Sequence, residues 1–487
     1  SGKIFWLATE RIRIAQQVHP HGVTEPSVVP DVDQPIPNGE ESAVAEVLRG
    51  WIESLGPIKA SAIASLLSVE LERIGIGLAR LETEGQVLRG RYTSTLLSSD
   101  DDIEWCSRRV LARIHHLTLG RLRREIEPVS PAVLVRFLVR WQHLAAGTLL
   151  HGTPGLLQII KQLQGYEIPA ASWEHDVLGA RVADYEPGML DHLCLSGEVM
   201  WGRLSLHPTA EWLRSGTEPT QINRPFRRIR PTRAAPVTLF LREDLHWLIP
   251  RINGVVVPEE GVVGGLSHPA KEILDTLHRR GASFISELIH DTARLATEVE
   301  DGIWELVAVG LVTADGFDNL RALIDPKRRR GEGKSRTARP RHSAGRWAML
   351  VDRRKLDQPG RDPRCCQEQA EMFTRQLLQR WGVVFRDLVQ RETLMPPWRE
   401  ILGALRRMEA RGEVRGGRFV SGFAGEQFAR ADAVELLRIV RRENQHVDGV
   451  SVSAADPMNL LGIVMPGSRI NSRSSETVEL LNSESVM

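Results

Sequence analysis

The pattern Gly-x-Val-x-x-Gly-Arg occurs three times in this chain, each time after a segment whose apolar residues follow helical spacing. The copies begin at Gly85, Gly197 and Gly412, and a shorter Gly-Leu-Val version begins at Gly310. Glycine readily adopts the left-handed conformation that ends a helix, and the alternating residues after it are typical of a short strand. The second Gly-Arg fits a tight turn. Repetition at one spacing favours a repeated supersecondary unit over coincidence among unrelated helix-to-strand turns.

Helix, glycine stop, strand and arginine-bearing turn is the order expected for the third helix and wing of a winged helix-turn-helix. The chain has 487 residues, which is long enough for roughly three or four domains. We therefore expect a mainly α fold with small β wings, built from tandem winged-helix domains with a small C-terminal β element.

Composition and apolar spacing predict seven segments along the chain. They are residues 1–37, the end of a preceding unit with a Pro-rich connector; 38–100, a winged helix; 101–220, a basic helical segment and a winged helix; 221–325, a strand segment and a winged helix; 326–360, a basic disordered linker; 361–466, a winged helix, a helix and the small β element; and 467–487, a disordered tail.

The net charge of +1 gives no global electrostatic argument for nucleic-acid binding. The basic residues are instead clustered locally, and only seven of the 63 Lys and Arg residues are lysine. Arginine suits bidentate contacts to phosphates and bases, although codon bias in the source genome explains the excess equally well. The predicted DNA contacts are Arg108, Arg109, Arg123, Arg124, Arg203, Arg406, Arg407, Arg411 and Arg418. A merely solvated charged face is the alternative.

The four cysteines, Cys106, Cys194, Cys365 and Cys366, form no Cys-x-x-Cys pair, so we expect reduced thiols and no zinc site. No apolar run approaches a membrane span, which favours a cytoplasmic, nucleoid-associated protein without membrane contact. The first residues, SGKIFWLATERIRI, lack an initiator Met, and we expect the chain to be part of something longer.

Two long stretches resemble the C-terminal half of the bacterial large helicase-related (Lhr) family. They run from Glu104 to Leu204, through EWCSRRVLARIHHLTLGRLRREIEPVSP and DHLCLSGEVMWGRL, and from Gly412 to Gly462, through GEVRGGRFVSGFAGEQFARADAVELLRIVRR. The resemblance implies a DNA-repair helicase whose amino-terminal half is an ATP motor and whose tandem winged helices can associate into a homo-oligomer. DNA and the motor half are thus the implied partners.

No motor motif lies in this chain, so we expect no cofactor here, with ATP and Mg confined to the missing helicase half. The tail after Pro466 also departs from the family's strand and Asp-Gly turn, which puts any function of the terminal region in doubt.

Gln162-Leu163-Gln164 is similar to a motif of winged-helix DNA glycosylases of the AlkZ/YcaQ type. That resemblance implies that Gln162 and Gln164 are catalytic and hold a water against the sugar, while Glu167 or Glu174 supplies negative charge. Two surface glutamines at a helix end are the alternative. Asp456, in the segment AADPMN, is predicted to form an Asp-Pro turn rather than to act as a base.

Three functions therefore remain open. The main one is a DNA-binding, non-motor region of a repair helicase. The second is a metal-independent DNA glycosylase that removes uracil or alkylated bases. The third is an oligomerisation scaffold, suggested by the acidic residues Glu298, Glu300 and Asp301 in the third helix of the third module.

Overall fold

The computed structural model describes residues 3–27, 39–93, 103–124, 126–205, 235–249, 251–252, 255–256, 265–324, 345–351, 363–443, 449–472, 474 and 476–480. It divides into two compact units, Ser1–Glu125 and Ile126–Met487. Among the described helices, none is both long and apolar enough to cross a membrane.

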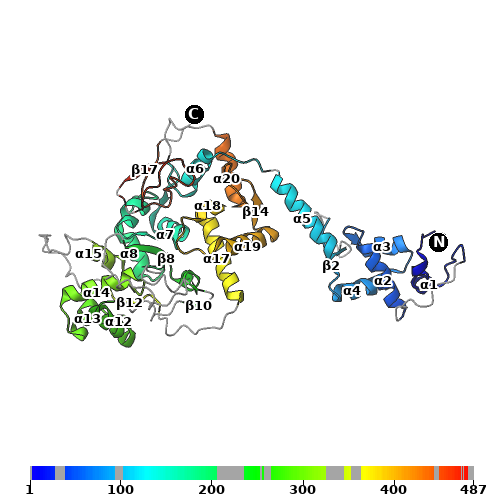
Figure 1. Cartoon of the computed structure of the whole chain (residues 1–487), viewed down its shortest axis with the longest axis horizontal. Helices are drawn as coiled ribbons and strands as arrows, with labels where there is room; N and C mark the ends of the chain where they lie inside the picture. Colours follow the sequence, from blue (N-terminus) through cyan, green and yellow to red (C-terminus); the bar gives the residue numbers. More distant parts are fainter. Residues whose placement is uncertain are drawn as a thin grey trace, which may run out of the picture. The chain divides into compact units, whose positions relative to one another are not determined.

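The first unit contains a winged helix (Figure 1). Its elements are α2 (Glu40–Ile52), β1 (Ile58–Lys59), α3 (Ala60–Leu67), α4 (Leu71–Thr83), β2 (Val87–Gly90) and β3 (Glu104–Ser107), and the antiparallel sheet has the order β1-β3-β2. Gly77 interrupts the helical pattern of α4 for a packing reason. A Cβ at that position would lie 2.6 Å from Leu48 Cδ1, so glycine lets α2 and α4 approach closely.

Two further helices belong to this unit. α1 (Ile12–Val18) packs on α2 and contributes Val18 to the same core, whereas the sequence predicted the tail of a preceding unit there. The basic segment after β3 forms α5 (Arg108–Arg124), as its amphipathic pattern predicts.

The second winged helix is built from α7 (Gly152–Leu163), β5 (Ile168–Pro169), the π-helix η3 (Trp173–Leu178), α8 (Pro187–Leu195), β7 (Val199–Gly202) and β8 (Pro236–Leu241), with β4 (Leu150–His151) and β6 (Val182–Ala183) pairing in parallel beside it. Its three-stranded sheet has the order β5-β8-β7. The strand segment predicted within 221–325 therefore exists, as β8, but it completes the sheet of this second module and does not belong to the third. Residues 171–182 follow a pattern that predicts a helix, but only Trp173–Leu178 are helical, as η3.

The third winged helix contains α12 (His268–Arg280), α13 (Ile285–Thr292), α14 (Ala296–Ala308), β11 (Val312–Ala314), α15 (Phe317–Ile324) and β12 (Trp347–Met349). β12 pairs with β11, and Trp347 also bridges to Ser283 between α12 and α13. The predicted linker 326–360 is therefore wrong for residues 345–351, which complete this module. Its other residues lie outside the described part of the chain. The same holds for residues 221–233, whose basic, Pro-containing sequence predicts a linker before the third module.

The fourth winged helix is formed by α17 (Pro363–Trp381), β13 (Val383–Val384), α18 (Arg386–Val389), α19 (Trp398–Ala410), β14 (Val414–Gly417) and β15 (Gln427–Arg430), with sheet order β13-β15-β14. α20 (Ala431–Arg442) follows and packs on α6 (Pro131–Trp141), a helix that begins at Pro131 and is capped by the Ser130 hydroxyl.

The C-terminal β element pairs β16 (Ser451–Ser453) with β17 (Thr477–Glu479). The sequence from Val450 to Gly467 predicts a strand, a turn and a second strand. The first strand is confirmed, but its partner comes from the segment predicted to be a disordered tail. That prediction is wrong for the described residues around Val478, which is buried in this pairing.

The repeated glycines end their helices in the same way. Gly85, Gly197, Gly310 and Gly412 have φ of 70°, 81°, 76° and 78°, and a short strand begins two residues after each. The left-handed stop and the strand after it are thus confirmed for all four copies, together with a mainly helical fold of tandem winged helices.

Candidate functional site

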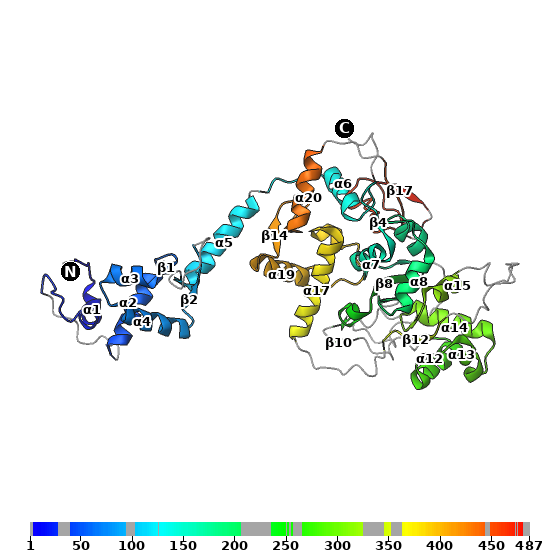
Figure 2. The same ribbon diagram turned by 180° about the vertical axis from the view of Figure 1, so that it is seen from behind.

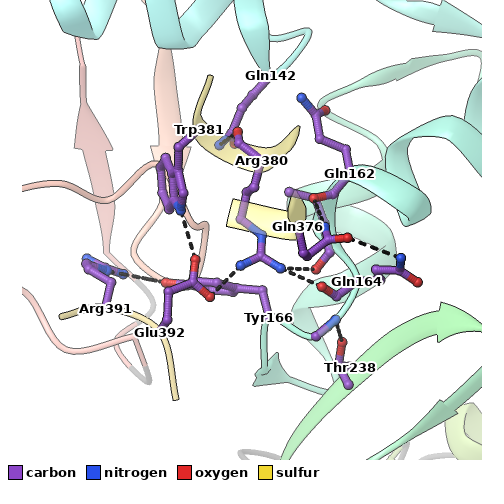
Figure 3. A network of polar contacts seen from close by, with 12 residues as sticks. Gln142, Gln162, Gln164, Tyr166, Thr238, Gln376, Arg380, Trp381, Arg391 and Glu392 are labelled. Carbon is purple, nitrogen blue, oxygen red and sulfur yellow. Dashed lines mark hydrogen bonds and ion pairs between the residues drawn. The ribbon is translucent and has the colours of Figure 1, made fainter. Parts of the chain in front are cut away.

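Gln162 and Gln164 lie at the end of α7, inside the protein (Figure 3). Their exposed fractions are only 6% and 2%. The Gln164 Nε2 donates to Asp244 Oδ2 at 2.8 Å and to Gln376 Oε1 at 3.1 Å, and its Oε1 accepts the Leu241 N–H at 3.1 Å. The alternative of two surface glutamines is therefore wrong.

Helix α17 lies beside α7 (Figure 2). Its side chains complete the network by hydrogen-bonding the carbonyls at the C-terminal end of α7. Gln376 Nε2 donates to the carbonyls of Lys161 and Gln162 at 3.1 and 2.8 Å, and the buried Arg380 guanidinium donates to those of Leu163 and Gln164. The last carbonyls of a helix have no partner within it, so these bonds replace water at a buried helix end. The network joins the second winged helix to the fourth.

Both amide atoms of Gln164 are thus used within the protein. Gln162 Nε2 donates to the Trp141 carbonyl at 2.9 Å, and its Oε1 has no hydrogen-bond partner in the part of the chain that the structure describes. This geometry gives the two glutamines a structural role between modules. The water-holding role stays a prediction.

A cavity of ≈ 420 Å³ lies beside this network. Three segments far apart in sequence line it: Tyr166 and Glu167 after α7, Arg391 and Thr393 after α18, and Ala455 with residues 469–472 between β16 and β17. Its size falls within the usual range of small-ligand sites. The cavity combines a carboxylate with two arginines and several hydroxyl and amide groups.

Only one carboxylate oxygen of Glu167, Oε1, has hydrogen-bond partners among the described residues. Oε1 accepts the N–H groups of Leu204 and Ser205, both at 2.7 Å, which fixes the carboxylate against the end of β7. Oε2 is shielded from solvent and has no hydrogen-bond partner among the described residues. A buried polar oxygen without a partner is rare enough in native proteins to call for an explanation.

Glu174, the other predicted source of charge, is fully occupied. It pairs with Arg321 through contacts of 2.6 and 2.9 Å and accepts the Tyr185 hydroxyl at 2.8 Å. Burial, reinforced by the Glu174 carboxylate, raises the pKa of Tyr185, so this phenol remains a donor. Glu174 therefore stabilises the contact with α15 and is unavailable for chemistry.

Tyr166 also lines the cavity. Arg391 donates to its hydroxyl at 3.2 and 3.3 Å and also to the Asn459 carbonyl, while the Arg380 guanidinium lies 5.3 Å from the ring centroid. Burial raises the pKa of Tyr166, so its hydroxyl stays protonated. Arg391 thus joins the fourth module and the C-terminal β element to the second module at the cavity.

The predicted arginines of the fourth module are exposed, but they differ in their partners. Arg407 and Arg418 pair with no carboxylate among the described residues. Arg406 pairs with Glu426 at 2.6 Å, and Arg411 pairs with Glu371 and Glu413 at 2.7 and 2.5 Å. Arg407 and Arg418 are therefore the freer cations on this face.

Arg203 was also predicted to contact DNA, but the structure places it in an interface. It is 8% exposed, and its guanidinium donates to the Ala308 carbonyl at 2.8 Å and to the Ser205 carbonyl at 3.2 Å. The prediction is wrong in this arrangement, because Arg203 holds the second module against the third.

The predicted arginines of α5 lie in the first unit. Arg108 and Arg109 are exposed, and Arg109 is 3.9 Å from Glu53. Arg123 is half-buried, and the side chain of Arg124 lies outside the described part of the chain. Helix α5 thus presents some of its cations to solvent.

The sequence did not indicate the cavity or its two arginines, Arg391 and Arg469. Neither belongs to a motif, and the segments that carry them meet only in the folded chain. No cluster of His, Cys, Asp and Glu side chains suited to a metal ion occurs within the described ranges.

Comparison with known families bears on the second and fourth modules. Two models with the description "Large helicase-related protein, winged-helix domain" match residues 129–214 and 365–448. The resemblance to the Lhr family is confirmed. The matched ranges contain α7 to β7 and all of α17 to α20 except the first two residues of α17. The Lhr domains therefore coincide with the modules joined by the glutamine network.

Two Lhr relatives match most of the chain. "Lhr helicase/ probable uracil glycosylase" of Mycolicibacterium smegmatis is 27% identical over 490 residues, which cover 96% of this chain and 29% of that protein. "Lhr helicase/uracil glycosylase" of Escherichia coli is 26% identical over 432 residues, which cover 80% of this chain and 25% of that protein. The chain thus spans less than a third of either Lhr relative and corresponds to a non-motor region.

Proposed function

We propose that this chain is the DNA-holding, non-motor region of an Lhr-like repair helicase. The observation that carries the proposal is the set of exposed arginines on the third helix of the fourth winged helix and on its wing. Among the described residues these arginines have no ion-pair partner: Arg399, Arg407, Arg415 and Arg418. The third helix is the element that winged and other helix-turn-helix domains insert into the major groove.

The arginines on α19 and its wing supply a sequence-independent attraction to phosphates. Each phosphate neutralised by an arginine releases condensed counterions, so the logarithm of the binding constant falls with the logarithm of salt concentration by about 0.9 per contact on duplex DNA. Arg406 and Arg411 contribute less, since each must leave a carboxylate partner before it binds a phosphate.

The test is duplex binding by the full chain, measured by fluorescence anisotropy at several salt concentrations. Arg407→Ala and Arg418→Ala together are expected to weaken binding across sequences and to reduce the salt slope by about 2, one for each lost contact. Arg438→Ala is the matched control, because Arg438 is an exposed arginine of α20, off the recognition helix. Equal slopes for all three proteins would refute the proposed face.

A second candidate function is removal of damaged bases without a metal. Two observations favour it: the cavity beside Glu167, and the words "uracil glycosylase" in the names of both relatives. Base removal requires a DNA-holding surface and a pocket for an extruded nucleotide. The DNA-holding function does not depend on this second one.

A further inference from the structure

Arg391 is a cation held in a fixed orientation at the wall of the cavity. It is half-buried and pairs with no carboxylate among the described residues. Its Nε and Nη2 donate to the Tyr166 hydroxyl at 3.3 and 3.2 Å (Figure 3), and its Nη1 donates to the Asn459 carbonyl. These bonds use three of the five N–H groups of a guanidinium. Two donors of a fixed positive group therefore remain for a ligand.

The hydroxyl of Tyr166 supplies a further donor. Its oxygen accepts both bonds from Arg391, whereas its own hydrogen has no acceptor among the residues that the structure describes. The side chain is only 6% exposed, and burial raises its pKa, so the hydroxyl keeps that hydrogen. A buried polar group with an unused donor is uncommon in native proteins. Its position at the wall of a cavity indicates a ligand that carries an acceptor.

The charge of the cavity lining favours an anionic ligand. Arg391 and Arg469 contribute two positive groups and Glu167 one negative group, which leaves a formal charge of +1. The Glu167 charge is offset by the N–H groups of Leu204 and Ser205, which donate to its Oε1. Arg469 is exposed and pairs with no carboxylate in the described part of the chain. Planar guanidinium groups bind phosphate through paired donors, so a phosphate group fits this lining.

The cavity is close along the chain to the candidate recognition helix. Arg391 and Thr393 belong to the turn before α19, which begins at Trp398. The five residues from Thr393 to Trp398 span at most about 17 Å even when extended. A strand that leaves a duplex held on α19 can therefore reach the cavity. Proteins that bind unpaired strands hold the backbone in positively charged concave sites of this kind.

We propose that this cavity binds one phosphate group of an unpaired DNA strand through Arg391, Tyr166 and Arg469. The inference rests on the DNA-holding function and names the form of DNA that this region holds, a duplex that continues into a single strand. Arg391 and the Tyr166 hydroxyl donate to the phosphate oxygens, and Arg469 adds positive charge on the exposed side. The phosphate is a terminal monoester of the strand or a diester within it, because both present the same acceptor oxygens.

The test measures binding of the full chain to two DNA molecules by fluorescence anisotropy. One is a blunt duplex, and the other is the same duplex with a single-stranded overhang of about ten nucleotides, which at 3.4 Å per nucleotide exceeds the reach of about 17 Å. The wild-type chain is expected to bind the overhang duplex roughly tenfold more tightly, the gain expected from hydrogen bonds to one charged group.

The overhang is prepared with and without a phosphate at its end, on the 5′ strand and on the 3′ strand. A preference confined to the phosphorylated end assigns the site to a terminal monoester. An equal preference for the two ends assigns it to a diester within the strand. Either result supports the phosphate site, provided that the preference depends on the cavity residues.

Tyr166→Phe removes the hydroxyl and keeps the buried ring. It is expected to lower the preference for the overhang to about twofold or less, while binding of the blunt duplex, which shows that the variant is folded, stays at the wild-type level. Arg469→Ala should lower the preference by a smaller factor, because salt screens an exposed cation. Tyr185→Phe and Arg438→Ala are the matched controls and should retain the preference, since Tyr185 donates to Glu174 within the protein and Arg438 lies on α20.

The outcomes separate this inference from the DNA-holding function. Tight binding of the blunt duplex without a preference for the overhang, or a preference that survives Tyr166→Phe, overturns the phosphate site and leaves the DNA-holding function intact. Loss of the preference in Tyr185→Phe as well overturns its assignment to this cavity. Failure of the wild-type chain to bind either DNA overturns the DNA-holding function and the inference with it.

Discussion

Arg181 and Asp456 form a bidentate ion pair with contacts of 2.6 and 2.8 Å, although 275 residues separate them in the chain. Both side chains are fully buried. Asp456 Oδ1 also accepts the Met458 N–H at 2.8 Å, which confirms the predicted turn, and Gln142 accepts from Arg181 at 3.1 Å. The pair fastens the C-terminal β element to the second winged helix.

Asp456→Ala is expected to detach the C-terminal β element, because it leaves the Arg181 charge buried and unpaired. Breaking one side of such a pair costs about 3–5 kcal/mol. Replacing both residues, Arg181→Met with Asp456→Leu, should recover much of that loss, since no buried charge remains. Hydrogen exchange of residues 451–479 measures both effects, and equal destabilisation by the single and double changes would contradict this account.

Gln164→Ala is expected to loosen the contact between the second and fourth modules. The change removes the acceptor of the buried Leu241 N–H and the donor to Asp244, and an unsatisfied buried group costs about 1–3 kcal/mol. Faster hydrogen exchange in residues 239–245 and 376–380 is the expected signature. Gln164→Glu keeps an oxygen that can accept the Leu241 N–H but loses the amide hydrogens that Gln164 donates to Asp244 and Gln376. Comparing it with Gln164→Ala therefore separates the contribution of the accepted bond from that of the donated bonds. Unchanged exchange in both variants would exclude the structural role.

The hydrogen bonds of Glu104 predict how the stability of the first winged helix changes at acid pH. Its carboxylate accepts the Thr93 hydroxyl and the N–H groups of Tyr92 and Thr93, and these bonds hold the pKa of Glu104 below its usual range. The charged form is thus favoured in the folded state. The resulting stability is complete above the ordinary glutamate pKa and is lost as pH falls through the lowered value.

Glu104→Gln provides the comparison. At neutral pH the variant is expected to show faster hydrogen exchange in β2 and β3 than wild type, because an amide accepts these N–H groups less strongly than a carboxylate does. The difference should shrink as pH falls below the ordinary glutamate pKa and Glu104 becomes protonated at its lowered pKa. A difference that stays constant with pH would show that the charge of Glu104 is not the cause.

Local features of the fold could be predicted from the sequence, whereas pairings between distant segments could not. The positive φ of Gly412 and the strand at Val414 follow from residues within one helix turn. β17 was missed because its segment is polar, and only pairing with β16 buries Val478. β8 was assigned to the wrong module because its partners β5 and β7 precede it across a long connection.

The same contrast between local features and distant pairings holds for the candidate site. The sequence pointed to the stretch after α7, through the Gln-Leu-Gln motif and Glu167, because these residues are neighbours in the chain. It could not show that α17 buries the glutamines, since Gln376 lies 212 residues beyond Gln164. Arg203 matched the repeat but is buried, because the third module packs on it.

The repeat offers a matched pair of substitutions that separates backbone strain from packing. Gly310 and Gly412 have nearly the same φ, 76° and 78°. A Cβ at Gly310 would lie 2.3 Å from the Arg203 carbonyl oxygen, whereas nothing lies within 4 Å of one at Gly412. Gly412→Ala therefore changes only the left-handed conformation, which costs an alanine about 1–2 kcal/mol.

Gly310→Ala must bear the same strain and also displace the backbone at Arg203, where the second and third modules meet. It is expected to destabilise the chain clearly more than Gly412→Ala. It should also speed hydrogen exchange in β7 and β11, which are joined by the bond from Thr313 Oγ1 to the Trp201 carbonyl at 2.6 Å. Similar unfolding temperatures and similar exchange in β7 for the two variants would mean that the close approach of Gly310 to Arg203 contributes nothing to this interface.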